Sequence, residues 1–559
     1  MKSTSKRHPM VRWYDPVLLA KTGIRATVST AIGEVADSRE IHAALTAPPK
    51  IYDHSKDTKS TEDFWFDFVA DLGDGWQAGN TVAKAICQET INIDGQEIPR
   101  GKLLIMGGYE VYPTPSQEAY RERTIDPWNE ACKDLPPFET TLYALPGNHD
   151  WYDGLHAFSE IFCRGDRQST VSAGESFDCL KTVQSHSYFA LKLKKGWWLC
   201  GIDIALNDQI DRVQNDFFFE VAKKIKKGDR LILCAPTPSW VKEARGMTGA
   251  TDLLNNVADL LTANGGKLRL VLTGDLHHYA RYGADDDPAM LLTAGGGGAF
   301  MHPTHKLPDA VVIKPDGKNN ETFAKQECYP PVDVSARLTW HNLLFPFYNH
   351  RFALAAGMVY LLLVWFLETR SLGADQILGA KIVEMMESHI SITDTLAHFF
   401  SLIPRSPEFA IIVAMVAAAL IAFNMTRNKL ARVTVGLLHT LLHITGLVFA
   451  YCMAILFLTM LPETLQVKSF GLPFFLVTLF VTGSLLAGFI FGAYLIFSLN
   501  VLGWQWTNAF SALRIENYKN FLRFKIDSEG VLTVYAFGID DVSESPVKPH
   551  LIEKPYTLN

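Results

Sequence analysis

The chain has 559 residues, a formal net charge of −7 and a mean hydropathy of +0.07. The length excludes a single small domain, because one hydrophobic core rarely serves more than about 250–300 residues. The slight acidic excess excludes a general electrostatic attraction to nucleic acid, so no nucleic-acid partner is expected.

Eight cysteines are scattered along the chain and none forms a Cys-x-x-Cys pair, so the sequence does not predict a zinc-finger site. The basic segment Met1–Arg7 is not followed by an apolar stretch, and we therefore expect no signal peptide. Scattered cysteines without a secretory signal favour a reducing, cytoplasmic location for the soluble part.

Residues 1–340 have the composition of a soluble domain, and one pattern recurs within residues 60–300. An apolar run of strand character ends in a polar loop, and helix-compatible sequence follows. The predicted strands are Phe66–Ala70, Leu103–Met106, Thr141–Leu145, Leu231–Cys234 and Leu268–Thr273. This alternation predicts an α/β fold. Because ligands of open α/β sheets bind beyond the carboxyl ends of strands, we expect the five loops to form one composite site.

Residues 345–503 are predicted to form a transmembrane domain of about four helices. Stretches 409–425, 433–461 and 474–499 are apolar and long enough to cross a bilayer, and 349–367 has a shorter apolar core. The three strongest spans contain no ionisable residue besides two histidines. We therefore expect a lipid-embedded anchor, or a unit through which a homo-oligomer forms, rather than an ion carrier.

The loop Thr426–Arg432 carries three basic residues and no acid, so the positive-inside rule places it in the cytoplasm. Loops 368–408 and 462–473 lack such a basic excess and are expected outside. Four crossings would then leave both chain termini in the cytoplasm. The expected location is the inner membrane of a bacterium, as a multi-pass protein.

His439 and His443 are four residues apart and share one face of their predicted helix. One interpretation is a pair of metal or haem ligands, or a proton relay. We favour polar contacts between helices, which are the commoner role of intramembrane histidines without charged neighbours.

Residues 504–559 are predicted to form a cytoplasmic tail with its own secondary structure. The apolar runs Phe521–Ile526 and Val531–Ala536 flank the turn sequence Asp527–Gly530, which predicts a β-hairpin. We expect this hairpin to pack back on the soluble domain.

Two loops concentrate Asn, His and Asp side chains, which bind divalent cations and transfer protons at phosphate esters. They read Gly147-Asn148-His149-Asp150 and Gly274-Asp275-Leu276-His277-His278-Tyr279-Ala280-Arg281. Two further loops at predicted strand ends read Asp71-Leu72-Gly73 and Gly107-Gly108-Tyr109-Glu110-Val111-Tyr112. Together the four loops predict metal-dependent phosphate chemistry.

In order and content these loops resemble the motifs of the calcineurin-like metallophosphoesterase superfamily, and those of its purple-acid-phosphatase type in particular. That pattern has Asp-x-Gly, an Asp followed three residues later by a Tyr, Gly-Asn-His-Glu/Asp and Gly-His-x-His-x-Tyr-x-Arg. The resemblance covers residues 65–300, and the added helical half is similar to membrane-bound bacterial members. It implies an α/β/β/α sandwich of two mixed sheets, with one or two divalent ions of Mn, Fe, Zn or Mg.

The resemblance also implies roles for individual residues. The ligands of the first metal would be Asp71, Tyr112 and His277. Asn148 would bind the second metal. His149 would stabilise the transition state or protonate the leaving group, and Asp150 would orient His149 through its ring nitrogen.

The chain departs from the pattern at three positions. Tyr109 stands where the resemblance requires the carboxylate that bridges both ions, and a phenol has only one oxygen for that task. Pro236, before Pro238-Ser239-Trp240, stands where the fourth motif has a histidine. Asp275 replaces the first histidine of the last motif, a milder change because a carboxylate is also a good ligand. Tyr109 is consistent with an engineered inactivating change, with a natural loss of catalysis, or with a ligand in a rearranged site.

Other polar residues near these motifs are secondary candidates. Asp74 is either an additional metal ligand or a solvated turn residue. Glu110 is expected to point away from the site, because side chains alternate along an extended segment. His278 is expected to line the site or enter the core, and His302 and His305 to lie on a loop surface.

The sequence supports two main hypotheses. The first is a membrane-anchored phosphohydrolase that acts on a phosphate mono- or diester at the cytoplasmic face, such as a lipid or lipid-linked phosphoester, a nucleotide or a phosphoprotein. The second is a non-catalytic phosphate-binding or regulatory membrane protein, which the changes at Tyr109 and Pro236 favour. A transporter gated by the soluble domain is a third class, and the scarcity of intramembrane charge counts against it.

Overall fold

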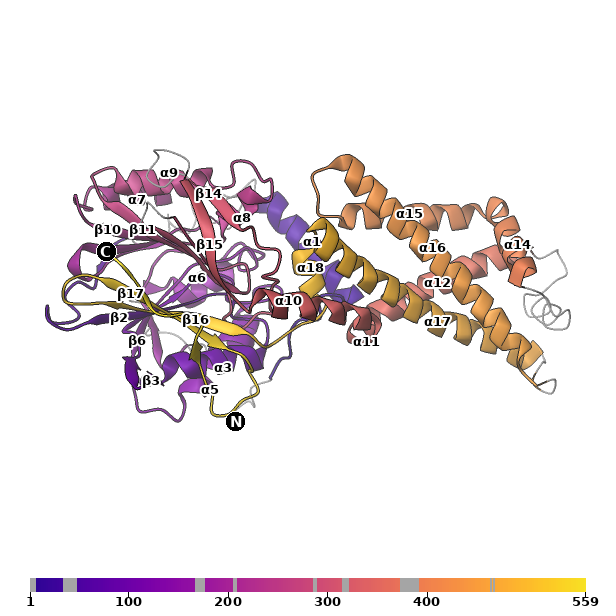
Figure 1. Cartoon of the computed structure of the whole chain (residues 1–559), viewed down its shortest axis with the longest axis horizontal. Helices are drawn as coiled ribbons and strands as arrows, with labels where there is room; N and C mark the ends of the chain where they lie inside the picture. Colours follow the sequence, from indigo (N-terminus) through magenta and orange to yellow (C-terminus); the bar gives the residue numbers. More distant parts are fainter. Residues whose placement is uncertain are drawn as a thin grey trace. The chain divides into compact units, whose positions relative to one another are not determined.

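The structure, a computed structural model, describes residues 7–33, 48–165, 176–204, 209–284, 289–313, 321–371, 392–462, 465 and 468–559 (Figure 1). The chain divides into two compact units. The first comprises Met1–Val11, Lys21–Ala336 and Arg514–Asn559, and the second comprises Arg12–Ala20 and Arg337–Leu513. The C-terminal tail therefore belongs to the same unit as the N-terminal domain.

Among the described residues, the first unit contains a mixed sheet of eight strands in the order β18-β17-β16-β2-β5-β6-β7, with β19 beside β17. Strands β2, β5, β6 and β7 run parallel, and β16 pairs antiparallel with β2. The strands are β2 (Phe64–Val69), β5 (Leu103–Met106), β6 (Thr140–Ala144), β7 (Leu180–Thr182), β16 (Lys519–Ile526), β17 (Leu532–Ile539), β18 (His550–Leu551) and β19 (Tyr556–Leu558).

A second sheet of nine described strands has the order β1-β8-β9-β10-β11-β13-β12-β15-β14. Its central strands β9, β10, β11 and β13 are parallel. The strands are β1 (Ile51–Asp53), β8 (Phe189–Lys192), β9 (Trp197–Gly201), β10 (Arg230–Ala235), β11 (Lys267–Thr273), β12 (Tyr279–Gly283), β13 (Met290–Ala294), β14 (Ala310–Ile313) and β15 (Glu321–Tyr329). A separate two-stranded ribbon is formed by β3 (Thr90–Ile93) and β4 (Gln96–Pro99).

The two large sheets face each other across a shared apolar core. Alternation along β2 shows how the sequence builds it, because successive side chains of a strand point to opposite faces. Phe64, Phe66 and Phe68 enter the core between the sheets, whereas Val69 joins the core beneath the helices. Both faces of this strand are buried, which explains its nearly continuous apolar sequence.

Helices cover the outer faces of both sheets, which gives the α/β/β/α layering that the resemblance predicts (Figure 1). The apolar faces of α3 (Trp76–Cys87), α5 (Asp126–Cys132) and α6 (His156–Phe162) pack on the eight-stranded sheet. Helix α9 (Asp252–Thr262) packs against β10, β11 and its neighbour α7 (Arg212–Ala222) on the other sheet. The short helical segments of this unit are α4 (Gln117–Tyr120), η1 (Arg121–Ile125), η3 (Lys194–Gly196) and α8 (Ser239–Ala244).

The C-terminal hairpin supplies two strands of the eight-stranded sheet (Figure 1). Strand β16 lies beside β2 over the register Leu522–Phe68 to Ile526–Phe64. Within this pairing the buried Arg523 guanidinium donates to both oxygens of Asp67, at 2.6 and 3.1 Å. The hairpin expected in the tail is therefore present, and it completes the sheet that carries the first three predicted strands.

The second unit is helical. Three of its helices are long and apolar enough to cross a membrane, over His350–Thr369, Lys429–Thr459 and Phe470–Leu502. The described helices are α12 (His350–Ser371), α14 (Ile392–Leu402), α15 (Pro407–Phe423), α16 (Lys429–Thr459) and α17 (Lys468–Phe497). The other described helical segments that lie wholly or partly in this unit are α1 (Pro16–Gly33), α10 (Val332–Thr339), η5 (Trp340–Leu344), α11 (Phe345–Tyr348), η6 (Ile403–Arg405), η8 (Ser498–Leu502) and α18 (Trp506–Ser511).

The predicted span 409–425, one of the three strongest in the sequence, is not among the three helices that meet the length requirement for a crossing. Helix α15 is shorter than the other three, and it follows the segment Leu396–Arg405 after a bend of 93°. Pro404 and Pro407 lie at the bend, where proline cannot donate the backbone hydrogen bond that would continue a helix. Leu396–Arg405 and Pro407–Phe423 form a fourth membrane span only if this bent pair of helices crosses the membrane as a single span. Residues 372–391 of the predicted outer loop 368–408 lie outside the described residues.

His443 makes a polar contact with a neighbouring helix, as the simpler interpretation predicts, whereas the described contact of His439 is a ring stack. His443 Nδ1 lies 2.9 Å from the hydroxyl of Tyr360 on α12, and His439 stacks on Tyr494 of α17 at 4.1 Å between ring centroids. His443 also borders an apolar cavity of about 140 Å³. These contacts connect three helices of the unit.

Candidate metal centre

The loops that follow β2, β5 and β11 meet at the carboxyl ends of these strands, although β11 belongs to the other sheet. The amide of Asp275, after β11, donates to Asp71 Oδ2 at 2.9 Å. The hydroxyl of Tyr112, after β5, donates to Asp71 Oδ1 at 2.9 Å. Strand β6 adds a loop on which His149 packs against Tyr112, with 4.7 Å between ring centroids. Four of the five predicted loops thus form one site.

Asp71, Tyr112 and His277 bring three donor atoms together. His277 Nε2 lies 3.0 Å from the Tyr112 hydroxyl and 3.5 Å from Asp71 Oδ1. Ligands bound to one ion at about 2.0–2.2 Å lie about 3.0–3.5 Å apart, so these separations suit the corners of one coordination shell. The three residues are those that the resemblance implies for the first metal.

Backbone contacts fix the orientation of these donors. His277 Nδ1 lies 2.6 Å from the carbonyl oxygen of Phe300, which can only accept. The ring therefore carries a proton on Nδ1, and this contact turns Nε2 toward the cluster, as second-shell partners do for metal-binding histidines. Asp71 has a left-handed backbone with φ of 62°, and its amide donates to the carbonyl of Gly108 at 2.9 Å. This unusual turn points the carboxylate away from the strand and into the site.

The electrostatics of the cluster suit a cation. Burial raises the pKa of Asp71, and the neighbouring His277 only partly opposes this change. Burial and the Asp71 carboxylate raise the pKa of Tyr112 well above its usual value. A divalent ion would stabilise the ionised forms of both side chains. We call the cluster of Asp71, Tyr112 and His277 the first half of the site. Its donor atoms, their spacing and its buried acidic groups fit a metal ion.

The second half of the site is the position where the resemblance implies the second metal ion. It is different, because the Tyr109 ring fills it. A Cβ atom on Gly147 would collide with this ring, so the two residues are in close contact. The Tyr109 ring also lies nearly parallel to the Tyr112 ring, at 6.1 Å between ring centroids. Burial, followed by the charges of Asp275 and Asp71, raises the pKa of Tyr109 well above its usual value. A neutral phenol in this place does not fit the role of a bridging ligand.

Other donors in the second half are sparse. Pro236 lies beside Gly108, where a Cβ atom on that glycine would approach the proline ring at 3.3 Å. The Asn148 side chain is exposed, and Asp275 is half-buried. Glu110 is fully buried and its Oε1 accepts the Gly108 amide at 3.1 Å, so it does not replace the missing carboxylate. The residues present do not fit a second ion of the bridged kind.

The predicted link between Asp150 and His149 is corrected by the structure. Asp150 Oδ2 accepts the amides of Gly147 and Tyr109 at 2.7 and 3.1 Å, and Oδ1 accepts the Tyr120 hydroxyl at 2.5 Å. His149 Nδ1 instead lies 2.8 Å from the carbonyl oxygen of Pro113. Asp150 thus holds the turn that presents His149, while a backbone carbonyl orients the ring. Burial lowers the pKa of His149 to about 4.

Asp74 is neither a solvated turn residue nor part of the donor cluster. It is fully buried, and its two oxygens accept the amides of Val11 and Phe300 at 2.7 and 3.3 Å. The carboxylate therefore joins the N-terminal segment to the loop that carries the His277 acceptor. This structural role could not be read from the local sequence, because both partners are distant along the chain.

The three additional histidines differ in environment. His278 is fully buried, as expected for a core or lining residue. His302 is also buried and stacks on His277 at 4.0 Å, and its Nδ1 accepts the amide of His277 at 3.3 Å. The prediction that His302 lies on a loop surface is therefore wrong. His305 is half-buried, and its Nδ1 lies 2.8 Å from the hydroxyl of Ser335.

Two residues of the C-terminal strand β16 were not anticipated near the site. The Lys519 ammonium donates to the carbonyl of Ala299, and Asn520 exchanges hydrogen bonds with Gly296 at 3.1 and 3.3 Å. Burial lowers the pKa of Lys519 to about 8, although the acidic groups of Asp74 and nearby residues oppose this change. The glycine-rich loop that supports Asp71 therefore rests on the tail. No local signal could identify this contact, since more than 200 residues separate its partners.

Comparison with known families is consistent with this geometry. The sequence model of the calcineurin-like phosphoesterase family matches residues 64–279, and the chain therefore carries a domain of that kind. No curated protein sequence matches the chain. Divalent metal ions and a phosphoester substrate are the cofactor and ligand classes that such a domain implies.

Several solved structures are similar in fold. The anchor protein GAP50 of the Plasmodium inner membrane complex is 14% identical, with a TM-score of 0.33 over 47% of this chain and 78% of its own. Purple acid phosphatase PPD1 from yellow lupin seeds is 12% identical, with a TM-score of 0.27 over 48% of each chain. PhoD is 11% identical, with a TM-score of 0.28 over 45% of this chain and 59% of its own. This chain thus spans about half the length of the lupin enzyme.

Proposed function

We propose that this chain is a membrane-anchored, metal-dependent phosphoesterase whose ion is held by Asp71, Tyr112 and His277. The observation that carries the proposal is the spacing of these donors, between 2.9 and 3.5 Å, inside a calcineurin-like phosphoesterase domain. A divalent ion at this position polarises a phosphate group and lowers the pKa of a water molecule. The proposed reaction is hydrolysis of a phosphate mono- or diester.

The protein's own groups would position the phosphate beside this cluster. His149 packs on Tyr112 and is our candidate for the group that stabilises the reacting phosphate or protonates the leaving oxygen. Asp150 acts through the turn, because it holds the amides of Gly147 and Tyr109. The exposed amide of Asn148, on the same turn, is placed to contact substrate oxygens from the solvent side.

The location of the substrate follows from the helical unit. The apolar helices support a lipid-embedded anchor, and the basic residues Arg427, Lys429 and Arg432 between α15 and the core of α16 favour a cytoplasmic position for that end. We propose a multi-pass protein of a bacterial inner membrane with both termini in the cytoplasm. A lipid or lipid-linked phosphoester is then the favoured substrate class, with a nucleotide or a phosphoprotein as alternatives.

A second candidate function is phosphate binding without turnover. The specific observation in its favour is that the Tyr109 ring occupies the space against Gly147, with Pro236 nearby, so that the second half of the site lacks its bridging carboxylate and histidine. In this case the domain would recognise a phosphoester and transmit its presence to the helical unit.

The two candidates are separated by hydrolysis of an aryl phosphate with added Mn²⁺. The full chain in detergent would be compared with Tyr109→Asp, which restores a carboxylate, and with the matched control Tyr109→Phe, which only removes the hydroxyl. His277→Ala serves as the negative control, since it removes a proposed ligand.

Turnover by the native chain that His277→Ala abolishes would support the phosphoesterase. Turnover only in Tyr109→Asp would support the binding protein, because the fold would then be competent and only the bridge would be missing. Inactivity of all variants, combined with phosphate binding that depends on His277, would also favour the second candidate. Inactivity without metal or phosphate binding would contradict both.

A further inference from the structure

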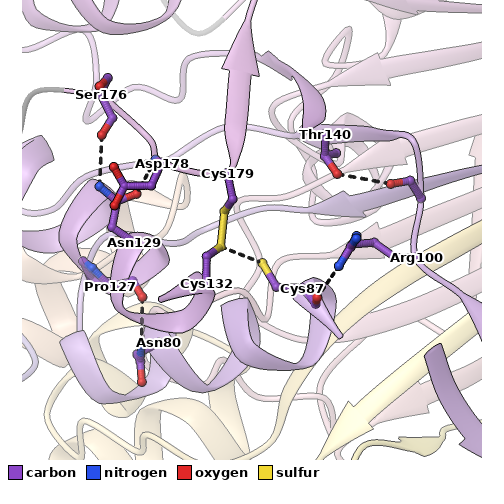
Figure 2. The surroundings of a disulfide bond; sticks show 11 residues. Asn80, Cys87, Arg100, Pro127, Asn129, Cys132, Thr140, Ser176, Asp178 and Cys179 are labelled. Carbon is purple, nitrogen blue, oxygen red and sulfur yellow. Dashed lines mark hydrogen bonds between the residues drawn. A yellow bond between two sulfur atoms is a disulfide. The ribbon is translucent and has the colours of Figure 1, made fainter. Parts of the chain in front are cut away.

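Three cysteines far from the metal centre come together beneath the eight-stranded sheet (Figure 2). Cys132 and Cys179 are joined by a disulfide, and the free thiol of Cys87 lies 3.4 Å from Cys132 Sγ. Cys87 is the last residue of α3, Cys132 is the last residue of α5, and Cys179 directly precedes β7. The three cysteines are 45 and 47 residues apart along the chain, so their spacing did not indicate this cluster.

The segments that carry the sulfur atoms are held together by hydrogen bonds that do not involve sulfur (Figure 2). The Asn80 side chain on α3 donates to the carbonyl of Pro127 on α5 at 2.8 Å. The Asn129 side chain on α5 donates to the Ser176 carbonyl at 3.0 Å and accepts the Asp178 amide at 2.8 Å. The three sulfur atoms therefore remain neighbours whichever pair is bonded.

The cysteines differ in their access to solvent. Cys179 borders a cavity of about 250 Å³ whose cations, Arg164 and Lys181, are paired with Glu160 and Glu139 of the same lining. Cys87 does not border this cavity and is 1% exposed, compared with 5% for Cys179. The cavity therefore gives a small soluble thiol a route to Cys179 that it does not give to Cys87.

We propose that Cys87, Cys132 and Cys179 form a thiol–disulfide exchange site, in which the disulfide moves between Cys132–Cys179 and Cys87–Cys132. The Cys87 sulfur, after loss of its proton, attacks Cys132 Sγ. The Cys87–Cys132 bond forms as the Cys132–Cys179 bond breaks, and Cys179 leaves as a thiolate that takes up one proton. No electron is gained or lost, so the rearrangement needs no oxidant. It changes Cys179 from a bonded cysteine to a free thiol at the cavity.

The ligand class that follows is a small thiol and its disulfide, which would react with Cys179 at the cavity. If the first unit is cytoplasmic, as proposed above, a disulfide there belongs to the transient or redox-sensing kind, because stable structural disulfides are rare in that compartment. Helix α3 begins at Trp76, five residues after Asp71 of the candidate metal centre, and ends at Cys87 of the exchange site. One helix therefore connects the two sites along the chain.

The electrostatic surroundings of Cys87 determine how fast the exchange is. Burial raises the pKa of Cys87 to about 12, with Arg100 and Arg523 opposing this change and Asp67 adding to it. Arg100 also donates to the Cys87 carbonyl at 2.6 Å, which keeps the guanidinium beside the end of α3. Since only the thiolate attacks, the exchange rate is expected to rise about tenfold per pH unit between neutral pH and this pKa.

The test is disulfide mapping of the full chain in detergent, equilibrated in a glutathione redox buffer. The sample is quenched with acid, free thiols are alkylated, and peptides are identified by mass spectrometry without reduction. Native protein should contain both bonds, with alkylated Cys87 in one population and alkylated Cys179 in the other. Cys179→Ser should form the Cys87–Cys132 bond, and Cys87→Ser should show only Cys132–Cys179.

Cys163→Ser is the matched control, because Cys163 is a free buried cysteine of the same apolar cluster and should leave the native pattern unchanged. The proposal is overturned if Cys179→Ser keeps both remaining thiols free in a buffer that fully oxidises Cys87→Ser. It is also overturned if native protein shows Cys132–Cys179 alone across the redox range, or if the three thiols are found reduced with one bound metal ion per chain. If a variant fails to fold, disulfide mapping of the native protein across the redox range decides between the proposal and its alternatives.

Discussion

The two halves of the candidate metal centre lie side by side at the strand ends but differ in the side chains that they contain. In the first half, Asp71, Tyr112 and His277 converge within hydrogen-bonding distance, and backbone groups orient them. In the second half, Tyr109 and Pro236 replace the expected ligands, and an aromatic ring packs on Gly147. The backbone of these loops is therefore compatible either with a set of metal-binding side chains or with an aromatic ring in their place. Metal binding depends on a few side chains, while the fold depends on the amides and carbonyls around them.

The two halves also have different supports. The first half rests on the glycine-rich loop near Gly296, which hydrogen-bonds to Asn520 of the C-terminal strand β16. The second half rests on the turn closed by Asp150. Substitutions can be made in the segment that supports one half, or in the side chains that fill it. Such variants can show whether the two halves are independent.

The largest effect is expected when the strand beneath the first half is detached. Arg523 and Asp67 form a fully buried ion pair between β16 and β2. Arg523→Ala leaves the Asp67 carboxylate buried without its partner, which costs about 3–5 kcal/mol. Chemical denaturation of the first unit, followed by tryptophan fluorescence, measures this change. A loss below about 1 kcal/mol would show that the tail does not support the sheet.

The next largest effect is expected when one proposed metal ligand of the first half is removed. Asp71→Asn removes an anionic ligand, and we expect metal affinity to fall by more than about 100-fold, since loss of outer-shell partners alone costs 10–100-fold. Burial raises the pKa of Asp71, so its neutral replacement should leave the metal-free protein as stable as before, or more so. Isothermal titration with Mn²⁺ and a thermal melt separate these quantities. Unchanged affinity would remove Asp71 from the ligand set.

A smaller effect is expected when the second half is rebuilt. The double variant Tyr109→Asp and Pro236→His supplies a carboxylate and an imidazole, and we expect a second ion per chain with at least about tenfold faster aryl phosphate hydrolysis. Tyr109→Ala with Pro236→Ala is the control that removes the ring and opens space without adding ligands. An equal gain in this control would mean that the ring blocks access rather than replaces a ligand.

The smallest effect is the pH dependence contributed by Lys519. Its pKa is lowered to about 8 in the folded protein, compared with about 10.4 for an exposed lysine. Between these values the unfolded chain binds more protons than the folded one, so this residue makes the free energy of unfolding rise with pH. In metal-free protein, Lys519→Met should show a shallower rise than the native chain between pH 8 and 10, by about 1–3 kcal/mol. Parallel profiles would show that the pKa of Lys519 is the same in the folded and unfolded chains.

Much of the fold was predictable because its signals are local. Strand β5 was predicted with its observed bounds, and the other four predicted strands differ only at their ends. Apolar runs buried on both faces produce this signal, and the tail hairpin has an equally local turn sequence. The bend before α15 was missed because hydropathy measures apolar length and ignores the interruption near Pro404 and Pro407.

Side-chain partners were harder to predict than strands. The resemblance implied that Asp150 orients His149, yet its oxygens accept backbone amides that only the folded turn presents. Asp74 and His302 bind partners from distant segments, and Lys519 reaches the site from the far end of the chain. Such contacts depend on tertiary structure and leave no periodic trace in the sequence. Glycine-containing loops at strand ends, by contrast, correctly predicted which segments of the chain come together.

The most direct test of the account is the metal content of the full chain, purified in detergent, loaded with Mn²⁺ and freed of excess ion. Inductively coupled plasma mass spectrometry would be applied to the native chain and to Asp71→Asn side by side. We predict one ion per native chain and none in the variant. Two ions per native chain would contradict the proposed difference between the halves, and no ion would contradict the assignment of Asp71, Tyr112 and His277 as ligands.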